Sequence, residues 1–189
     1  MIYHGTPTLE TERLVLRKFT PEDSGDMFEY ASDAEVSKYV TWDTHKTIDD
    51  SLGFIKYTLN RYMKDETGEW GIVLKENNKF IGSCSFVWME SKNLCGNIGY
   101  VLSRQYWNKG IMTEAVKRLI RFSFEEMKLN RIEAVHFIEN ESSGRVMQKA
   151  GMKYEGLMRQ KYFIKEKFRD IKQYAILKED WEKISKNEK

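Results

Sequence analysis

The chain has 189 residues, of which 41% are hydrophobic and 32% charged, and this size and composition predict one folded domain over residues 1–189. Its 31 basic and 29 acidic side chains are interspersed and leave a net charge of +2, which excludes the dense basic surface of a nonspecific nucleic-acid binder. No stretch approaches the ~18 apolar residues of a membrane span, and residues 1–11 lack a signal-peptide pattern, so we expect a cytoplasmic protein without a membrane partner.

The first elements predicted along the chain are one strand and three helices. Residues Arg13–Phe19 alternate polar and apolar side chains, as a strand near a sheet edge does. Thr20 is a candidate N-cap followed by proline, so a helix should run from there to about Ser32. A short helical piece over Asp33–Tyr39 and a longer helix over Thr47–Met63 follow. The apolar side chains spaced for one face of the longer helix are Ile48, Leu52, Ile55, Leu59 and Met63.

The middle of the chain alternates strands with turns. Strands are expected over Trp70–Lys75, Phe80–Met89 and Gly96–Leu102, separated by polar turns at residues 76–78 and 91–93. Because the turns are short, the three strands should form an antiparallel meander.

The last third predicts helices around one more strand and a closing strand pair. Arg131–Ile138 is apolar on both faces apart from Glu133 and His136, which is typical of a central strand. The other elements expected here are helices over Gly110–Met127 and Asn140–Ala150, the second ended by Gly151, a strand pair over Tyr154–Ile164 and Phe168–Leu177, and a helix over Lys178–Lys186. This order predicts a mixed α/β (α+β) fold that buries one sheet between helices.

The cysteines and histidines do not indicate a metal site. Cys84 and Cys95 cannot complete a tetrahedral site unaided, and no CxxC pairing is present. His4, His45 and His136 are far apart and lack the spacing of a helical metal pair. We therefore expect two reduced thiols and no metal.

The strongest functional signal is the segment Tyr106–Ala115, a short loop and helix start after the strand that ends at Leu102. Free backbone N–H groups at a helix N-terminus, with the positive end of the helix dipole, can bind a phosphate or pyrophosphate. Gly110 lets the backbone approach such a ligand, and Arg104 and Lys109 add positive charge. An ordinary helix start explains the same residues. The patterns GxxxxGK[ST] and GxGxxG are absent, which excludes the P-loop and the dinucleotide-binding fold.

Several segments form an ordered set that includes this loop: Thr11–Arg17, Thr20–Asp23, Ile98–Leu102, Tyr106–Ala115, and Asn140–Ser143 with Gln148–Met152. Together they resemble the successive motifs of the GNAT acetyltransferases, and most closely the RimJ/RimL branch of ribosomal-protein N-terminal alanine acetyltransferases. The match covers about residues 9–181. This resemblance implies a GNAT fold, in which helices flank a largely antiparallel sheet and two splayed central strands bind acetyl-CoA.

The resemblance implies acetyl-CoA as cosubstrate and assigns its contacts. The pantetheine arm would pair with the backbone of Val101 and Leu102 and contact Asn140. The pyrophosphate would lie on the backbone of Asn108, Lys109, Gly110, Ile111, Met112 and Thr113. Trp107 and Met112 depart from the wider family's loop pattern, but the interactions that matter there are main-chain, so the site should be retained.

The resemblance also implies a proton donor. Many GNAT enzymes carry a tyrosine where this chain has Met147, so that donor is absent. In the RimJ/RimL branch a serine three residues after the asparagine is the proposed donor to the departing thiolate, and Ser143 occupies that position. A serine that only bonds the backbone in the first turn of a helix is the alternative. The branch's strand motif often begins with glutamate, where this chain has Asn97.

The sequence does not decide which group acts as the general base. Glu90, at the end of a meander strand, and Glu139, beside Asn140, are candidates, although exposed carboxylates at strand ends are usually solvated charges. A water relay is a third possibility. An α-amine, with a pKa near ~8, needs less help from a base than a lysine or polyamine amine near ~10.4.

The sequence therefore predicts an N-acetyltransferase that acts on a protein N-terminus. The alternatives are an N-acetyltransferase for a small amine, such as a polyamine, an amino sugar or an aminoglycoside, and a noncatalytic acyl-CoA-binding protein. The resemblance assigns residues Tyr39–Trp42 to the lip of the acceptor site. Both a monomer and a homodimer are compatible with the sequence.

Overall fold

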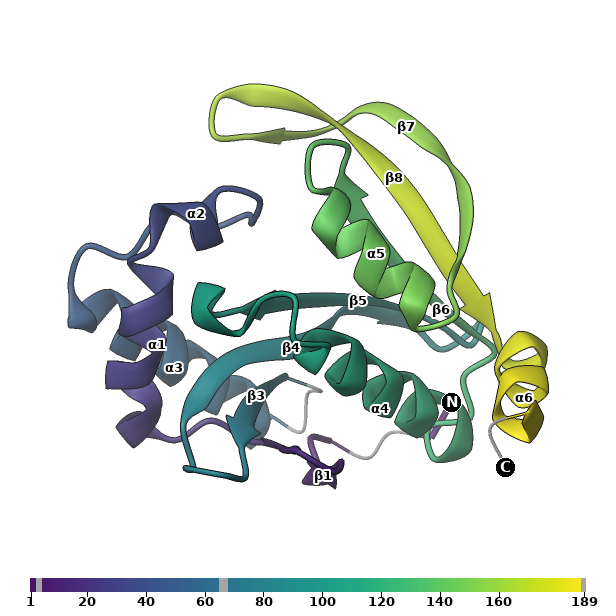
Figure 1. Cartoon of the computed structure of the whole chain (residues 1–189), viewed down its shortest axis with the longest axis horizontal. Helices are drawn as coiled ribbons and strands as arrows, with labels where there is room; N and C mark the ends of the chain where they lie inside the picture. Colours follow the sequence, from purple (N-terminus) through teal and green to yellow (C-terminus); the bar gives the residue numbers. More distant parts are fainter. Residues whose placement is uncertain (3–4, 65–67, 188–189) are drawn as a thin grey trace.

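The computed structural model describes residues 1–2, 5–64 and 68–187, and its centre is one eight-stranded sheet with helices on both faces (Figure 1). The elements in chain order are β1 (Leu9–Glu10), β2 (Leu14–Arg17), η1 (Pro21–Asp23), α1 (Ser24–Ala31), α2 (Ala34–Ser37), α3 (Ile48–Met63), β3 (Glu69–Leu74), β4 (Phe80–Glu90), β5 (Cys95–Leu102), η2 (Arg104–Tyr106), α4 (Ile111–Glu125), β6 (Arg131–Phe137), α5 (Glu141–Lys149), β7 (Lys153–Ile164), β8 (Lys167–Leu177) and α6 (Lys178–Asn187). The predicted order of elements is confirmed. The short β1 was not predicted, and His4 lies outside the described residues.

The strands follow the order β1-β2-β3-β4-β5-β6-β8-β7 across the sheet. The predicted meander β3-β4-β5 is confirmed, and every neighbouring pair is antiparallel except β5 and β6. These two parallel strands pair only from Cys95 to Ile98 and from Arg131 to Ala134, although both continue further. The central strands therefore separate halfway along the sheet.

Two cores lie on opposite faces of the sheet. Under α4, the first core contains the fully buried Trp70, with Phe122 edge-on at 5.8 Å between ring centroids. Under α1 and α3, the second contains Phe19 and Phe80 edge-on at 5.3 Å, together with Ile55. Each such side chain contributes about 1.5–3 kcal/mol when it is fully buried. The two cores hold the sheet rigidly between its helices.

The predicted apolar face of α3 is correct only in its centre. Ile55 is fully buried, but Ile48 and Met63, the first and last residues of the helix, are 49% and 77% exposed. The buried face instead includes the small residues Ser51 and Thr58. The Thr58 hydroxyl donates to a carbonyl one turn earlier at 3.0 Å, so its burial leaves no polar group without a partner.

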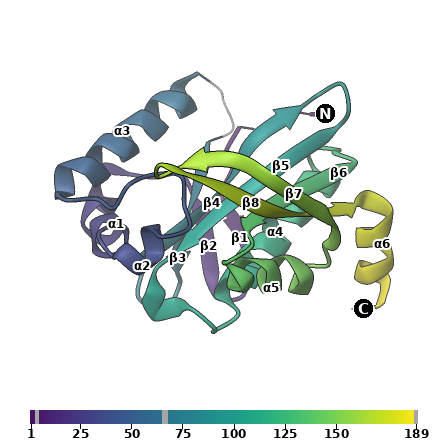
Figure 2. The ribbon, with the colours of Figure 1, turned by 90° about the horizontal axis from the view of Figure 1, so that it is seen from above.

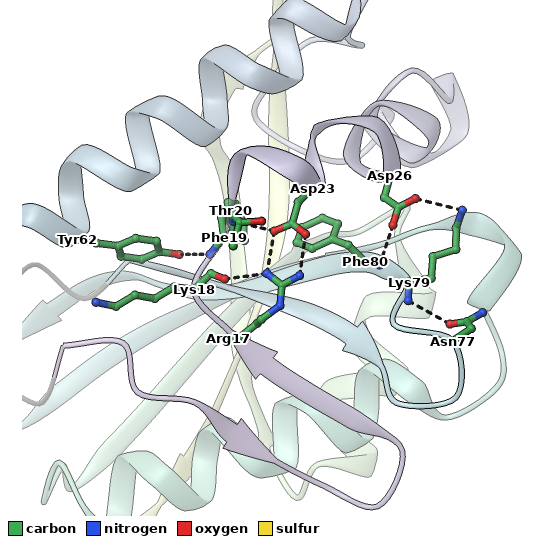
Figure 3. A network of polar contacts seen from close by, with 10 residues as sticks. All are labelled: Arg17, Lys18, Phe19, Thr20, Asp23, Asp26, Tyr62, Asn77, Lys79 and Phe80. Atoms are coloured by element: carbon green, nitrogen blue, oxygen red, sulfur yellow. Dashed lines mark hydrogen bonds and ion pairs between the residues drawn. The ribbon is translucent and has the colours of Figure 1, made fainter.

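An ion pair joins β2 to the helices that follow it (Figure 3). Thr20 and Asp23 form the predicted N-terminal cap, although the first turn, η1, is a 3-10 turn ahead of α1. The guanidinium of Arg17 donates to both carboxylate oxygens of Asp23 at 2.8 and 2.7 Å, and the Thr20 N–H donates to the same carboxylate at 2.8 Å. This contact raises the pKa of Arg17 and keeps α1 against the second core.

The C-terminal hairpin β7–β8 extends well beyond the rest of the sheet (Figures 1 and 2). Its far end reaches the α2 region, where the Lys165 ammonium donates to the carbonyl of Ser37 at 2.6 Å. The far end of the hairpin therefore contacts residues from the first quarter of the chain. Within the described ranges, no helix combines the length and apolar character that crossing a membrane requires.

Candidate active site

The loop between β5 and α4 presents the N-terminus of a long helix. Asn108 and Gly110 both have positive φ, 59° and 75°, and Gly110 is the N-cap of the 15-residue α4. No side chain in the described part of the chain caps this helix, so its first N–H groups point out of the loop. A Cβ added at Gly110 would meet nothing closer than the Arg13 guanidinium at 3.7 Å. Backbone conformation, and not crowding, therefore requires glycine here.

The segment before β2 supports this loop from behind. Arg13 donates from its guanidinium to the Lys109 carbonyl at 3.1 Å and to the Glu114 carboxylate at 2.7 Å. Thr11 donates its hydroxyl to the same carboxylate at 2.5 Å. Partial burial raises the pKa of Glu114, but the bonds from Thr11 and Arg13 outweigh it and lower the pKa. The sequence did not reveal this support, because its partners lie about a hundred positions apart.

Trp107 has a structural role that explains its place in the loop. Its indole N–H donates to the Leu102 carbonyl at 2.8 Å and so ties the loop to the end of β5. Arg104, which we expected to add charge at the phosphate site, forms an ion pair with Asp33 at 2.8 Å. The ammonium of Lys109 lies over the Tyr106 ring. Main-chain groups are therefore the donors that this loop could offer to an anion.

A side-chain contact spans the gap where β5 and β6 separate. The Tyr100 hydroxyl on β5 donates to the Ser143 carbonyl on α5 at 3.0 Å and lies 2.9 Å from the Ser143 hydroxyl. Asn140 caps α5, because its side-chain oxygen accepts from the Ser143 N–H at 3.3 Å. Burial raises the pKa of Tyr100, so the phenol stays protonated at neutral pH. The sequence identified Ser143 but missed its partner, although Tyr100 belongs to the same strand motif.

The two candidate bases lie in different places. Glu90 pairs with Cys95 across the β4–β5 turn and accepts a hydrogen bond from Asn93 at 2.8 Å. It therefore lies about 20 Å along the strand from Leu102, at the opposite end of β5. Glu139 is next to α5 but forms an ion pair with Arg169 at 3.2 Å. The described structure brings neither carboxylate into contact with Ser143 or Tyr100.

The cofactor residues assigned from the resemblance surround the separated strands. Val101 and Leu102 pair with β4 on one side only, since β5 has left β6 by this point. Residues 108–113 follow at the end of the same strand. The residues present thus fit acetyl-CoA: an open strand edge suits the amides of pantetheine, and an uncapped helix N-terminus suits a pyrophosphate.

A sheet whose parallel central strands separate, followed by a glycine loop and an uncapped helix, defines an acyl-CoA-dependent acetyltransferase fold. The family model described as an acetyltransferase (GNAT) domain matches residues 13–153. The chain belongs to the GNAT family, and it is an N-acetyltransferase that uses acetyl-CoA. The fold predicted from the resemblance is confirmed.

Individual relatives agree with this assignment. The chain is 33% identical over 174 residues to the uncharacterized N-acetyltransferase p20 of Bacillus licheniformis, covering 92% of this chain and 98% of that protein. A GNAT-family acetyltransferase structure from Bacillus anthracis matches with a TM-score of 0.83 and 32% identity, over 92% of this chain and 99% of that one. A ribosomal-protein-serine acetyltransferase of Escherichia coli is 29% identical over 104 residues, covering 55% of this chain and 58% of that protein.

Replacing Gly110 with valine is expected to raise the Kd for CoA about tenfold. A β-branched residue at positive φ costs about 1–2 kcal/mol, and relaxing that strain turns the first N–H groups of α4 away from the ligand. Isothermal titration calorimetry with CoA measures the effect. Gly53→Val is the matched control, because Gly53 lies in α3 with open space around its Cβ position. Unchanged affinity of the Gly110 variant would contradict this position for the pyrophosphate.

Proposed function

We propose that the protein acetylates the N-terminal α-amine of other proteins in the cytoplasm, as enzymes of the RimJ/RimL type do. Membership of the family implies acetyl-CoA as the acetyl donor, and the proposal concerns the acceptor. The partial similarity to a ribosomal-protein-serine acetyltransferase supports a protein acceptor. The charge around the acceptor side supports it independently.

The observation that carries the acceptor class is the positive charge of the β7–β8 hairpin. Over residues 153–177 its basic side chains are Lys153, Arg159, Lys161, Lys165, Lys167, Arg169 and Lys172, and its acidic ones are Glu155, Glu166 and Asp170. Lys165 contacts α2, close to residues Tyr39–Trp42, which the resemblance assigns to the acceptor lip. A polyamine carries several ammonium groups, which such a hairpin repels. A protein N-terminus brings one ammonium and can offer acidic side chains to the hairpin.

In the proposed reaction acetyl-CoA supplies an acetyl thioester, and the chain positions it. The N–H groups at the start of α4 hold the pyrophosphate, while the open edge at Val101 and Leu102 holds the pantetheine arm. Asn140 uses its oxygen to cap α5, which leaves its NH2 group for the same arm. The Ser143 hydroxyl donates a proton to the departing sulfur, and the Tyr100 hydroxyl fixes its orientation.

A panel of acceptors tests the proposal. CoA release is measured with alanine- and serine-starting peptides that have acidic second and third residues, and with spermidine, an amino sugar and an aminoglycoside. We expect kcat/KM for the peptides to exceed that for spermidine at least tenfold. Faster turnover of any of the small amines would reject the protein acceptor and favour the small-amine alternative.

A further inference from the structure

A row of polar side chains crosses three strands on the face of the sheet that α1 and α3 cover. Glu69 of β3 pairs with Ser85 of β4, and Ser85 pairs with Gly99 of β5. Side chains of paired residues share a face, and those two positions apart on a strand do too. Ser83 and Asn97 therefore belong to the same row. Val101, two positions beyond Gly99, packs against the second core and confirms this orientation.

The row reaches the place where the central strands part. The pairing of β5 with β6 ends at Ile98, so Gly99 is the first residue of β5 on the open edge. Glycine adds no side chain there, and an added Cβ would already lie 3.0 Å from Cγ2 of Val87. Two strand spacings of about 4.8 Å separate Glu69 from Gly99. A primary amine, alone or with one water molecule, can bridge that distance.

Asn97 gives a second and independent sign of a ligand. Asn97 is 7% exposed, and its side-chain amide makes no hydrogen bond within the described ranges. The amide is not sealed from solvent, so it borders an accessible space. A buried amide without a partner costs about 1–3 kcal/mol, and most such groups bind water or a ligand. Its partner is therefore expected to be a bound molecule on the face that carries Glu69.

Glu69 is the carboxylic acid of this row. It is partly exposed, yet burial raises the pKa of its carboxyl, and the hydroxyls of Ser85 and Ser83 oppose this only in part. Its carbonyl also accepts from the hydroxyl of Tyr62.

Among the described residues, the ionisable groups that interact electrostatically with Glu69 keep one charge state over the neutral range. Arg61 on α3 stays protonated, and its charge lowers the pKa of Glu69. Burial raises the pKa of Tyr62 on α3, Tyr30 on α1 and Cys84 on β4, so these three stay neutral. Among these groups, Glu69 is therefore the one whose raised pKa brings its titration closer to the neutral range.

We propose that Glu69 is the acceptor-site carboxylate, which binds the acceptor ammonium and takes its proton, with Asn97 as a hydrogen-bonding partner of the acceptor. The assignment rests on the proposed function and supplies the base that it lacks. The ammonium gives one proton to Glu69, and the nitrogen lone pair forms the C–N bond. The C–S bond then breaks and its electron pair goes to sulfur. The nitrogen loses a second proton as sulfur gains one through Ser143, and Glu69 releases its proton to water.

The test is the pH profile of Glu69→Gln with the best acceptor of the panel, followed by CoA release. In the wild-type enzyme kcat should rise with pH as the Glu69 carboxyl, whose pKa is raised, loses its proton. In the variant this step should disappear, and kcat near neutral pH should fall about 10- to 30-fold while the Kd for CoA stays the same. Glu69→Asp should restore part of the rate. Thermal unfolding verifies that both variants are folded.

Glu76→Gln is the matched control, since Glu76 is exposed in the turn at the other end of β3. A Glu69→Gln enzyme that keeps the wild-type rate and pH profile would overturn the assignment of Glu69 alone and leave the proposed function intact. A wild-type enzyme that releases no CoA with any amine would overturn the proposed function, and the assignment with it. A loss of CoA affinity equal to the loss of rate would also overturn it, because it would indicate a purely structural role.

Discussion

Replacing Ser143 with alanine is expected to lower kcat about 100-fold and to leave the Kd for CoA within about twofold. The expectation follows from the contact between the Ser143 and Tyr100 hydroxyls, 2.9 Å apart, across the gap between β5 and β6. A hydroxyl held there can protonate a sulfur that leaves through the gap. Without it the thiolate departs unprotonated, a step that slows catalysis but not binding.

Steady-state CoA release and calorimetry together measure the effect. The control is Ser142→Ala, which removes a neighbouring hydroxyl whose partner is Arg145 at 2.9 Å. Tyr100→Phe should give a smaller loss of about tenfold, because it removes the orienting group and keeps the donor. If Ser143 only bonded the backbone at the start of α5, its replacement would lower stability and leave kcat unchanged, which would remove its proposed role.

Replacing Asp23 with alanine is expected to lower the free energy of unfolding by about 2–3 kcal/mol. Asp23 is 5% exposed and accepts from both arms of the Arg17 guanidinium and from the Thr20 N–H (Figure 3). Removing it leaves the Arg17 guanidinium, whose side chain is 28% exposed, with only the Lys18 carbonyl as acceptor among the described residues, and it leaves the first turn of a helix without its cap. Urea denaturation followed by circular dichroism measures the change.

Asp43→Ala is the control for this experiment, because Asp43 is exposed in the loop before α3 and its loss should change stability by less than about 0.5 kcal/mol. The double variant Arg17→Ala, Asp23→Ala should recover part of the loss, since it removes the unpaired charge. A single variant as stable as the wild type would show that the ion pair contributes little.

The elements that the sequence predicted correctly are those specified by local signals. Thr20 and Asp23 form a cap over four residues, Gly151 ends α5 with φ at 89°, and Gly110 starts α4 with φ at 75°. Each depends on the preference of one residue type for one backbone conformation. The face of α3 was predicted less well. Helical spacing alone cannot reveal that Ile48 and Met63, at the two ends of α3, are exposed.

The candidate site also has one part that local sequence specifies and another part that only the folded chain brings together. The cofactor loop lies within one continuous segment, so its order of strand, glycine and helix could be recognised. The Tyr100–Ser143 contact joins positions 43 residues apart, and the link from Arg13 to Lys109 joins positions 96 apart. The polar row of Glu69 depends on the register of three strands. Such groupings exist only after the chain has folded.

The support that Arg13 gives to the loop has a further consequence for the N-terminal strands. Arg13 and Glu114 connect the segment before β2 to the start of α4, so a conformational change at one of these places affects the other. A ligand that holds the loop in one conformation also makes local opening of β1 and β2 rarer, by thermodynamic linkage. Amide hydrogen exchange in β1 and in its neighbour β2 thus becomes a remote reporter of cosubstrate occupancy.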